Sequence, residues 1–130
     1  MSFVHIMVVG EDSTLASFLA SHLTRPDVRV IGTTPGNTFL EDLMVSSPDI
    51  AVLDEIDQRP LAAQKEVAIL RQRYPRAVII AVSGHSTAVD GTIVEQGIYY
   101  YLAPRSRRRL LRVVEAALHK LDVTSVAASE

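Results

Sequence analysis

Three acidic residues directly follow apolar runs of the sequence and are candidates for metal or phosphoryl chemistry. Glu11 and Asp12 come after the run at residues 4–9, and Asp54 comes after the run at residues 49–53. Carboxylates that crowd together repel one another, so such a cluster persists only if some pKa values rise or a hard cation neutralises the charge. An all-oxygen site of this kind favours Mg²⁺ with several waters retained. The alternative is that each residue is an ordinary solvated acid of a surface loop.

The apolar runs that precede these acids belong to a pattern that recurs along the whole chain. Short runs of strand length alternate five times with longer segments of helical period, which predicts a β/α domain. Parallel strands need helical crossovers, and right-handed crossovers place helices on both faces of the sheet. We therefore expect a doubly wound, five-stranded parallel sheet in the flavodoxin-like order 2-1-3-4-5, with a site at the carboxyl ends of its strands. The expected strands are Val4 to Val9, Val28 to Gly32, Asp49 to Leu53, Ala77 to Val82 and Ile98 to Leu102.

Five segments of helical period separate and follow these strands. Ser13 and Ser106 are expected to cap the first and last helices, and Thr38 with Glu41 has the spacing of a capping box for the second. The third helix is expected from Leu61 to Tyr74. The fourth lies around residues 89–94 and ends at Gly97.

Composition limits the remaining classes. The chain has 130 residues, of which 48% are hydrophobic and 22% charged, as in one globular domain. Residues 1–121 are expected to form this domain, and residues 122–130 a tail or linker. A net charge of -2 argues against general binding to nucleic acid or membrane surfaces. There is no cysteine in the sequence, and we expect neither a signal peptide nor a membrane anchor, so the cytoplasm is the expected compartment.

From Val4 to about Leu121 the sequence resembles the receiver domains of bacterial response regulators. The acidic pair Glu11-Asp12 matches the family's pair after strand 1, and Asp54 matches the phosphoacceptor that ends strand 3. The hydroxyl residue that ends strand 4 in the family corresponds to Ser83. Each motif is weak alone, whereas their order and spacing together are fairly specific.

The resemblance implies a role for each acidic residue. Asp54 would accept a phosphoryl group from a histidine kinase or a phosphotransfer protein. Mg²⁺ would be held by Asp12, Asp54 and the carbonyl of Ile56, with Glu11 supporting the metal through water. This assignment agrees with the chemistry, because a carboxylate nucleophile needs a metal to screen the incoming phosphoryl oxygens.

The resemblance also implies residues that would contact the phosphoryl group and report its presence. Ser83 and the backbone at Gly84 would donate to a phosphoryl oxygen. The aromatic switch residue of the family would fall on Tyr100 or Tyr101. The modified domain would then act on an output domain or partner protein, as a signal transducer and not as an enzyme.

One residue that the family normally has is missing. The lysine before the proline that follows strand 5 is replaced by Ala103, next to Pro104. Arg105 follows two residues after the missing lysine, and because a strand rises ~3.3 Å per residue, its long side chain can fold back to the site. The sequence therefore offers Arg105 as a substitute for the lysine.

Cations and aromatics near the last strand and helix mark a candidate interface. Arg107, Arg108 and Arg109 lie in the first turn of the last helix, where the helix dipole disfavours positive charge. A partner surface or plain solvation would each account for them. Tyr99, beside the two switch candidates, suits an interface as well as packing at a sheet edge. If the domain forms a homodimer, we expect it to use this region.

Two functions of the receiver fold stay open, and a third is weaker. The chain is either a phosphorylatable receiver or a pseudo-receiver, an interaction module that works without phosphorylation; the absent lysine separates them. A flavin-binding relative of flavodoxin would need a hydroxyl- and glycine-rich phosphate loop after strand 1. The acidic segment from Gly10 to Asp12 would repel phosphate there.

Overall fold

A computed structural model describes residues 3–84 and 97–129, with only the helical backbone described for residues 123–129. The predicted fourth helix around residues 89–94 lies outside these residues. The elements alternate as the sequence predicts. In chain order they are β1 (Val4–Val9), α1 (Thr14–His22), β2 (Val28–Thr33), α2 (Asn37–Val45), β3 (Ile50–Leu53), α3 (Pro60–Arg73), β4 (Val78–Val82), β5 (Tyr100–Leu102) and α5 (Arg107–Ser129).

The five strands form one parallel sheet, which confirms the predicted fold class and strand order. The order is β2-β1-β3-β4-β5. In the register of the two central strands, Ile6 lies opposite Ile50 and Val9 lies opposite Leu53. Because β1 and β3 end side by side, the residues that follow them start from the same edge of the sheet.

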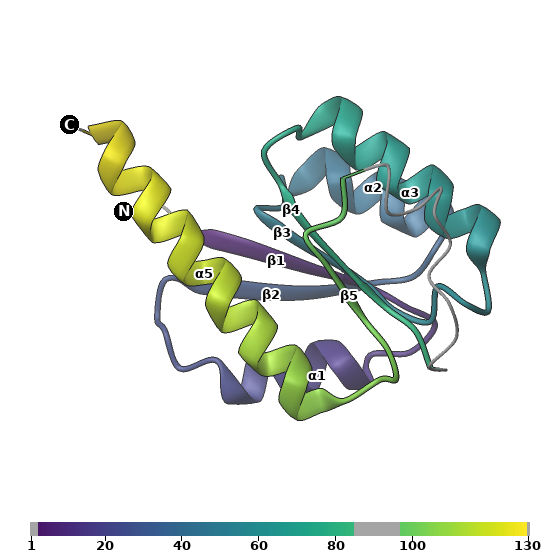
Figure 1. The fold of residues 1–130 in the computed structure, drawn as a ribbon. Helices are drawn as coiled ribbons and strands as arrows, with labels where there is room; N and C mark the ends of the chain where they lie inside the picture. The colour runs from purple at the N-terminus through teal and green to yellow at the C-terminus, as the bar shows by residue number, and fades with distance from the viewer. Residues whose placement is uncertain (1–2, 85–96, 130) are drawn as a thin grey trace.

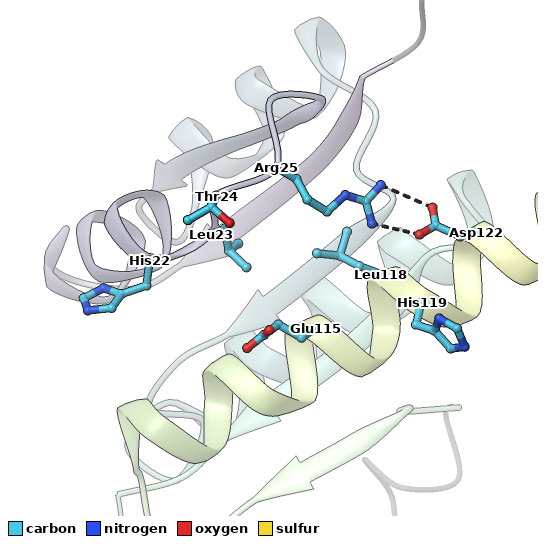
Figure 2. A pocket seen from close by; sticks show the side chains of 8 residues that line it. All are labelled: His22, Leu23, Thr24, Arg25, Glu115, Leu118, His119 and Asp122. Atoms are coloured by element: carbon cyan, nitrogen blue, oxygen red, sulfur yellow. Dashed lines mark hydrogen bonds and ion pairs between the residues drawn. The ribbon is translucent and has the colours of Figure 1, made fainter.

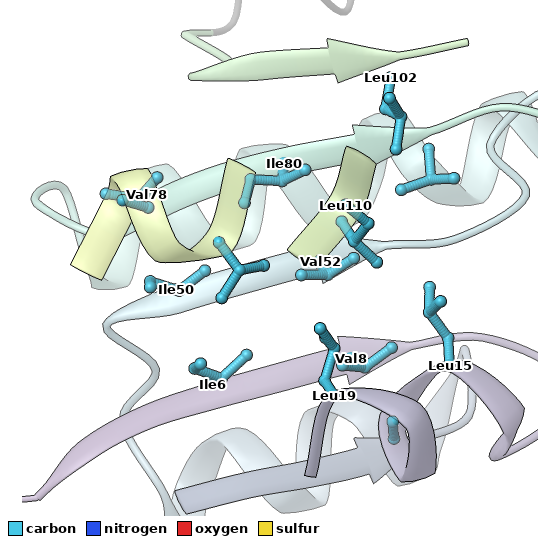
Figure 3. Packing of buried hydrophobic residues seen from close by; sticks show 14 of the residues in the cluster. Ile6, Val8, Leu15, Leu19, Ile50, Val52, Val78, Ile80, Leu102 and Leu110 are labelled. Carbon is cyan, nitrogen blue, oxygen red and sulfur yellow. The ribbon is translucent and has the colours of Figure 1, made fainter. Parts of the chain in front are cut away.

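Helices cover both faces of the sheet, with α1 and α5 on one face and α2 and α3 on the other (Figure 1). Alternation along β1 shows why: Ile6 and Val8 face α1 and α5, whereas Met7 and Val9 face α2 and α3. Figure 3 shows the first of these two cores, where side chains of the strands meet those of the helices. The strands are nearly continuous apolar runs because both faces are buried.

The caps of α1 and α5 differ from each other. Ser13 is the N-cap of α1, yet its side chain makes no capping hydrogen bond. The Asp12 carboxylate accepts one instead, from the backbone N–H of Thr14 at 2.9 Å. The predicted cap of α5 is confirmed, since the Ser106 hydroxyl accepts from the N–H of Arg109 at 3.3 Å.

The predicted capping box of α2 is wrong. The N-cap is Gly36, at φ 93°, and the helix begins at Asn37 with no side-chain cap. Thr38 is therefore already inside the first turn and cannot occupy the N-cap position that pairs with Glu41. The last strand also begins later than expected, at Tyr100.

α5 is longer than predicted, because the helix continues past Leu121 to Ser129. The residues expected to form a tail are thus helical in backbone. An ion pair joins the helix to the loop before β2, because Arg25 contacts Asp122 at 2.9 Å (Figure 2). Arg25 also contacts Asp27, within that loop, at 2.7 Å. No helix within residues 3–84 and 97–129 is long and apolar enough to cross a membrane.

Candidate functional site

Asp54 lies at the carboxyl edge of the sheet, directly after β3. Its backbone N–H donates to the carbonyl of Val9 at 2.8 Å, which joins the ends of the two central strands. Its side chain is only 5% exposed. A Cβ on Gly10 would come within 3.3 Å of the Asp54 Cβ, so the absence of a side chain at Gly10 gives Asp54 its room.

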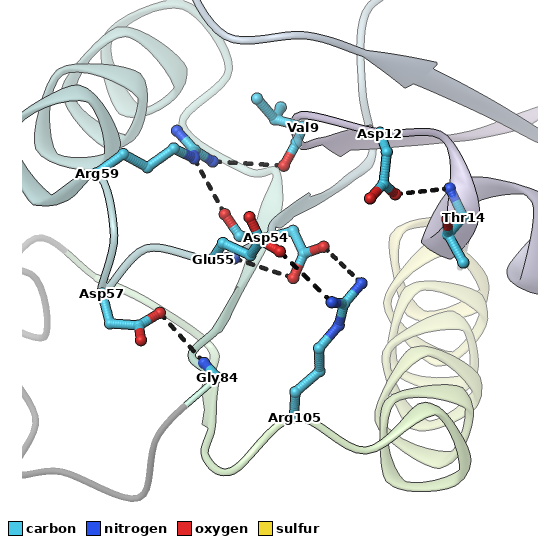
Figure 4. Close-up of polar contacts among 9 residues, drawn as sticks. All are labelled: Val9, Asp12, Thr14, Asp54, Glu55, Asp57, Arg59, Gly84 and Arg105. Atoms are coloured by element: carbon cyan, nitrogen blue, oxygen red, sulfur yellow. Dashed lines mark hydrogen bonds and ion pairs between the residues drawn. The ribbon is translucent and has the colours of Figure 1, made fainter.

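Arg105 reaches this carboxylate from the segment that joins β5 to α5 (Figure 4). Its guanidinium donates to Asp54 Oδ2 at 2.9 Å and lies 3.5 Å from Glu55 Oε1. The other oxygen of Asp54, Oδ1, accepts from the N–H of Glu55 at 2.9 Å. Glu55 has φ 51°, a left-handed conformation that costs energy for a residue with a side chain. The substitution of Arg105 for the missing lysine, offered by the sequence, is thus present as an ion pair.

The position of the missing lysine holds a small, half-buried side chain. Ala103 follows the last residue of β5, and the peptide bond between Ala103 and Pro104 is cis. No cation can therefore reach Asp54 from residue 103. The positive charge comes from two residues further along the chain.

The two acidic sites differ in their pKa values. Burial raises the pKa of Asp54 above its ordinary value, and the nearby Arg105 offsets part of that rise. Asp12 is exposed, and the hydrogen bond from the Thr14 backbone lowers the pKa of its carboxyl. Asp12 therefore carries its charge readily, whereas Asp54 carries it at a cost that Arg105 reduces.

The atoms that the resemblance assigns to Mg²⁺ already accept hydrogen bonds from the chain in this arrangement, so the metal site stays a prediction. Both oxygens of Asp54 already accept hydrogen bonds, and one oxygen of Asp12 accepts from the start of α1. The Ile56 carbonyl accepts from the N–H of Arg59 at 3.3 Å, and Glu11 is exposed. Among the described residues, no three acidic or histidine side chains are grouped so as to hold a metal ion.

A second arginine, which sequence reasoning missed, lies beneath the site. Arg59 donates to the carbonyls of Asp54 at 3.0 Å and Val9 at 3.3 Å, and to both carboxylate oxygens of Glu66 at 2.7 Å. The sequence does contain a signal for this pair. Residues 63, 66, 67 and 70 have the spacing of a buried helix face, and Glu66 is the one charged member of that face. A carboxylate on such a stripe needs a cationic partner.

The loops after β3 and β4 are joined to each other. Ser83 is fully buried, and its N–H donates to the carbonyl of Leu102 at 2.9 Å. The N–H of Gly84 donates to Asp57 Oδ1 at 3.1 Å. Ser83 and Gly84 thus lie at the same edge as Asp54, as expected, and Asp57 is a further acid of this edge that the sequence reasoning did not select.

The two switch candidates face different surroundings. Tyr101 is half-buried against the core formed with α2 and α3, whereas Tyr100 is 38% exposed. The hydroxyl of Tyr100 is 3.5 Å from the guanidinium of Arg109. Tyr101 is therefore the residue whose position depends on core packing.

Two of the three arginines at the start of α5 contact different aromatic residues. All three arginines are exposed. The guanidinium of Arg107 lies over the ring of Phe18 in α1, 5.7 Å from the ring centroid. Tyr99 instead contacts Lys120, whose ammonium lies 4.9 Å from the ring centroid. The predicted interface residues thus contact different elements, and their role in binding stays a prediction.

The chain is similar to known proteins in its structure but matches none of them by sequence. No protein-family model and no curated protein sequence matches the chain. A response regulator from Thermotoga maritima has a TM-score of 0.71 at 18% identity, over 90% of this chain and 98% of its own.

Two further solved structures extend the comparison. The chemotaxis response regulator CheY4 of Vibrio cholerae has a TM-score of 0.72 at 12% identity, over 89% of this chain and 99% of its own. An atypical orphan response regulator, described as having a phosphorylation-independent regulatory mechanism, has a TM-score of 0.69 at 18% identity, over 89% and 96% of the two chains. The chain therefore has the α/β fold of CheY-like response-regulator receiver domains.

Proposed function

We propose that the chain is a receiver-type signalling module that acts through protein contacts without phosphoryl transfer. The observation that carries this proposal is the ion pair between Arg105 and Asp54, at 2.9 Å. In the family a bound cation and a lysine compensate the negative charge of the acceptor site. Here Arg105 already contacts one oxygen of the carboxylate and the N–H of Glu55 donates to the other.

The electrostatics of the site support this function. Arg105 is shared between Asp54 and Glu55, so two carboxylates hold one guanidinium. A guanidinium is always protonated and presents a planar fork to both acids. A phosphoryl donor would have to displace this fork from a side chain that is 5% exposed. The atypical orphan regulator of the same fold gives a precedent for regulation without phosphorylation.

Phosphotransfer from acetyl phosphate in the presence of Mg²⁺, followed by intact mass, tests the proposal. We expect no lasting phosphoryl adduct on the native chain, and Asp54→Asn provides the blank. Arg105→Ala exposes the carboxylate and shows whether the arginine is the block. Rapid, stoichiometric modification of the native chain that Asp54→Asn abolishes would overturn the proposal.

The second candidate is the phosphorylatable receiver, with Asp54 as acceptor of a phosphoryl group from a histidine kinase or phosphotransfer protein. One observation favours it: Arg105 is 29% exposed, so its guanidinium is free to turn from the carboxylate to a phosphoryl oxygen. Mg²⁺ would then have to be held by Asp12, Asp54 and the Ile56 carbonyl, with Glu11 nearby. Ala103→Lys restores the family's lysine, so a gain of phosphorylation in that variant over the native chain would show that the rest of the site is competent.

A further inference from the structure

A groove of about 890 Å³ lies at the opposite end of the sheet from Asp54. Its walls are the segments that lead into β3 and β4, at the amino ends of these strands, and the second half of α5. Those segments contribute Pro48, Tyr74 and Pro75, and the helix contributes Lys120 and Leu121. The volume is within the range of protein sites that bind ligands or peptide side chains, roughly 300–1,000 Å³.

The charge of this groove is predominantly positive. Arg73 and Arg76 line it, both are exposed, and neither forms a hydrogen bond or ion pair with the described part of the chain. Lys120 is a third cation of the lining. The one carboxylate there, Asp49, is half-buried and accepts from the backbone N–H of His5 at 2.9 Å. Arg73 and Arg76 are thus not matched by acids of the groove among the described residues.

An exposed apolar surface adjoins the groove. Met44 is 82% and Val45 88% exposed at the end of α2. The hydroxyl of Tyr74 donates to the carbonyl of Leu43 at 2.9 Å, so the last turn of α2 is fixed to the wall of the groove. These two neighbouring side chains offer an apolar contact surface next to the cations of the groove.

We propose that this groove binds an acidic segment of a partner protein in which carboxylates alternate with apolar side chains. The carboxylates would pair with Arg73 and Arg76, and the apolar side chains would cover Tyr74, Pro75 and Met44. A nucleic acid backbone would use only the cations and leave the apolar wall uncovered. The site requires nothing from Asp54 and is independent of the function proposed above.

Binding of a short synthetic peptide of alternating glutamate and leucine to the full chain, followed by fluorescence anisotropy, tests the proposal. We expect saturable binding that weakens as salt screens the charges and that is lost when glutamine replaces glutamate or serine replaces leucine. Amide chemical shifts should change at residues 47–49, 73–78 and 120–121. The double variant Arg73→Glu with Arg76→Glu should weaken binding about tenfold or more.

Two controls make the test decisive. Arg112→Glu reverses an exposed arginine of α5 that has no ion pair among the described residues, and it should leave binding unchanged. Asp54→Asn should also leave it unchanged, which separates this site from the acidic one. Absence of saturable binding, equal binding of the glutamine peptide, or equal loss in Arg112→Glu would overturn the proposal. Tighter binding of single-stranded oligothymidine at the same residues would do so as well, in favour of nucleic acid.

Discussion

Two arginines contact Asp54, and they differ in what they hold. Arg59 lies under the site with a side chain that is 11% exposed, and it binds the backbone carbonyl of Asp54 together with the carboxylate of Glu66. Arg105 lies over the site with a side chain that is 29% exposed, and it binds the carboxylate of Asp54 itself. Arg59 therefore connects elements of the fold, whereas Arg105 compensates the negative charge of the candidate functional group.

The difference indicates which ion pair of the site can exchange its partners. Glu66 is buried, and burial raises the pKa of its carboxyl. Removal of Arg59 would therefore leave an uncompensated group in the interior, so the two side chains must stay paired. Arg105 keeps contact with water and shares its charge between two acids. The free-energy cost of exchanging one partner for another is therefore low for Arg105 and high for Arg59. Regulation at this edge of the sheet should accordingly pass through Arg105.

The largest expected effect is that of Arg59→Ala. The substitution leaves the buried Glu66 carboxylate without its cationic partner and removes a hydrogen bond to the carbonyl of Asp54, so we expect a loss of about 3–5 kcal/mol in the free energy of unfolding. Urea denaturation followed by circular dichroism measures it. Arg112→Ala, at an exposed position, should change the same quantity by no more than ~0.5 kcal/mol. A loss below ~1 kcal/mol for Arg59→Ala would contradict the view that this pair is structural.

Arg105→Ala should cost less, about 1–2 kcal/mol, because the lost partner is partly solvated and water can replace it. A double-mutant cycle sharpens the comparison. In the background of Asp54→Asn the same substitution should cost almost nothing, since the buried charge that Arg105 compensates is gone. Equal costs in the two backgrounds would mean that Arg105 stabilises the fold through contacts other than Asp54.

The smallest expected effect is on the titration of Asp54. Burial already holds its pKa above the ordinary 3.8, and Arg105→Ala should raise the pKa further. Because the folded pKa exceeds the unfolded one, the contribution of this group to stability is full below pH ~3.8 and is lost as the pH rises through the folded pKa. Carbon-13 NMR of the carboxyl group gives both pKa values. An unchanged or lower pKa in Arg105→Ala would show that the arginine does not act on this charge.

The fold was predictable because its signal is repeated along the chain. Five apolar runs with helical crossovers between them allow few topologies, and the order that places β1 beside β3 is the observed one. The ends of the elements were less predictable. Thr38 and Glu41 match the spacing of a capping box, yet the helix begins earlier, at Asn37, because the turn at Gly36 directs the chain into it.

The site was predictable in its position and only in part in its contacts. Asp54 and Ser83 end their strands as expected, because strand ends follow from apolar runs. The contact of Arg105 followed from the reach of its side chain. Arg59 was missed because it lies in a polar loop without periodicity. Its partner Glu66 lies inside the third predicted helix, away from the strand ends where the site was expected.

The most direct test of the central claim is the response of the native chain to beryllofluoride with Mg²⁺, a mimic of the phosphoryl group, read as amide chemical shifts of Ser83 and Tyr101. If Arg105 holds Asp54 in place of a cation and phosphoryl group, these shifts should stay small in the native chain. The chemical-shift changes should be larger in Ala103→Lys, where a second cation can contact the mimic. In the native chain a neutral contact of ~1 kcal/mol would change the ratio of the two conformations only about fivefold. A full response of the native chain that Ala103→Lys does not increase would contradict the account and identify Arg105 as a working replacement for the lysine.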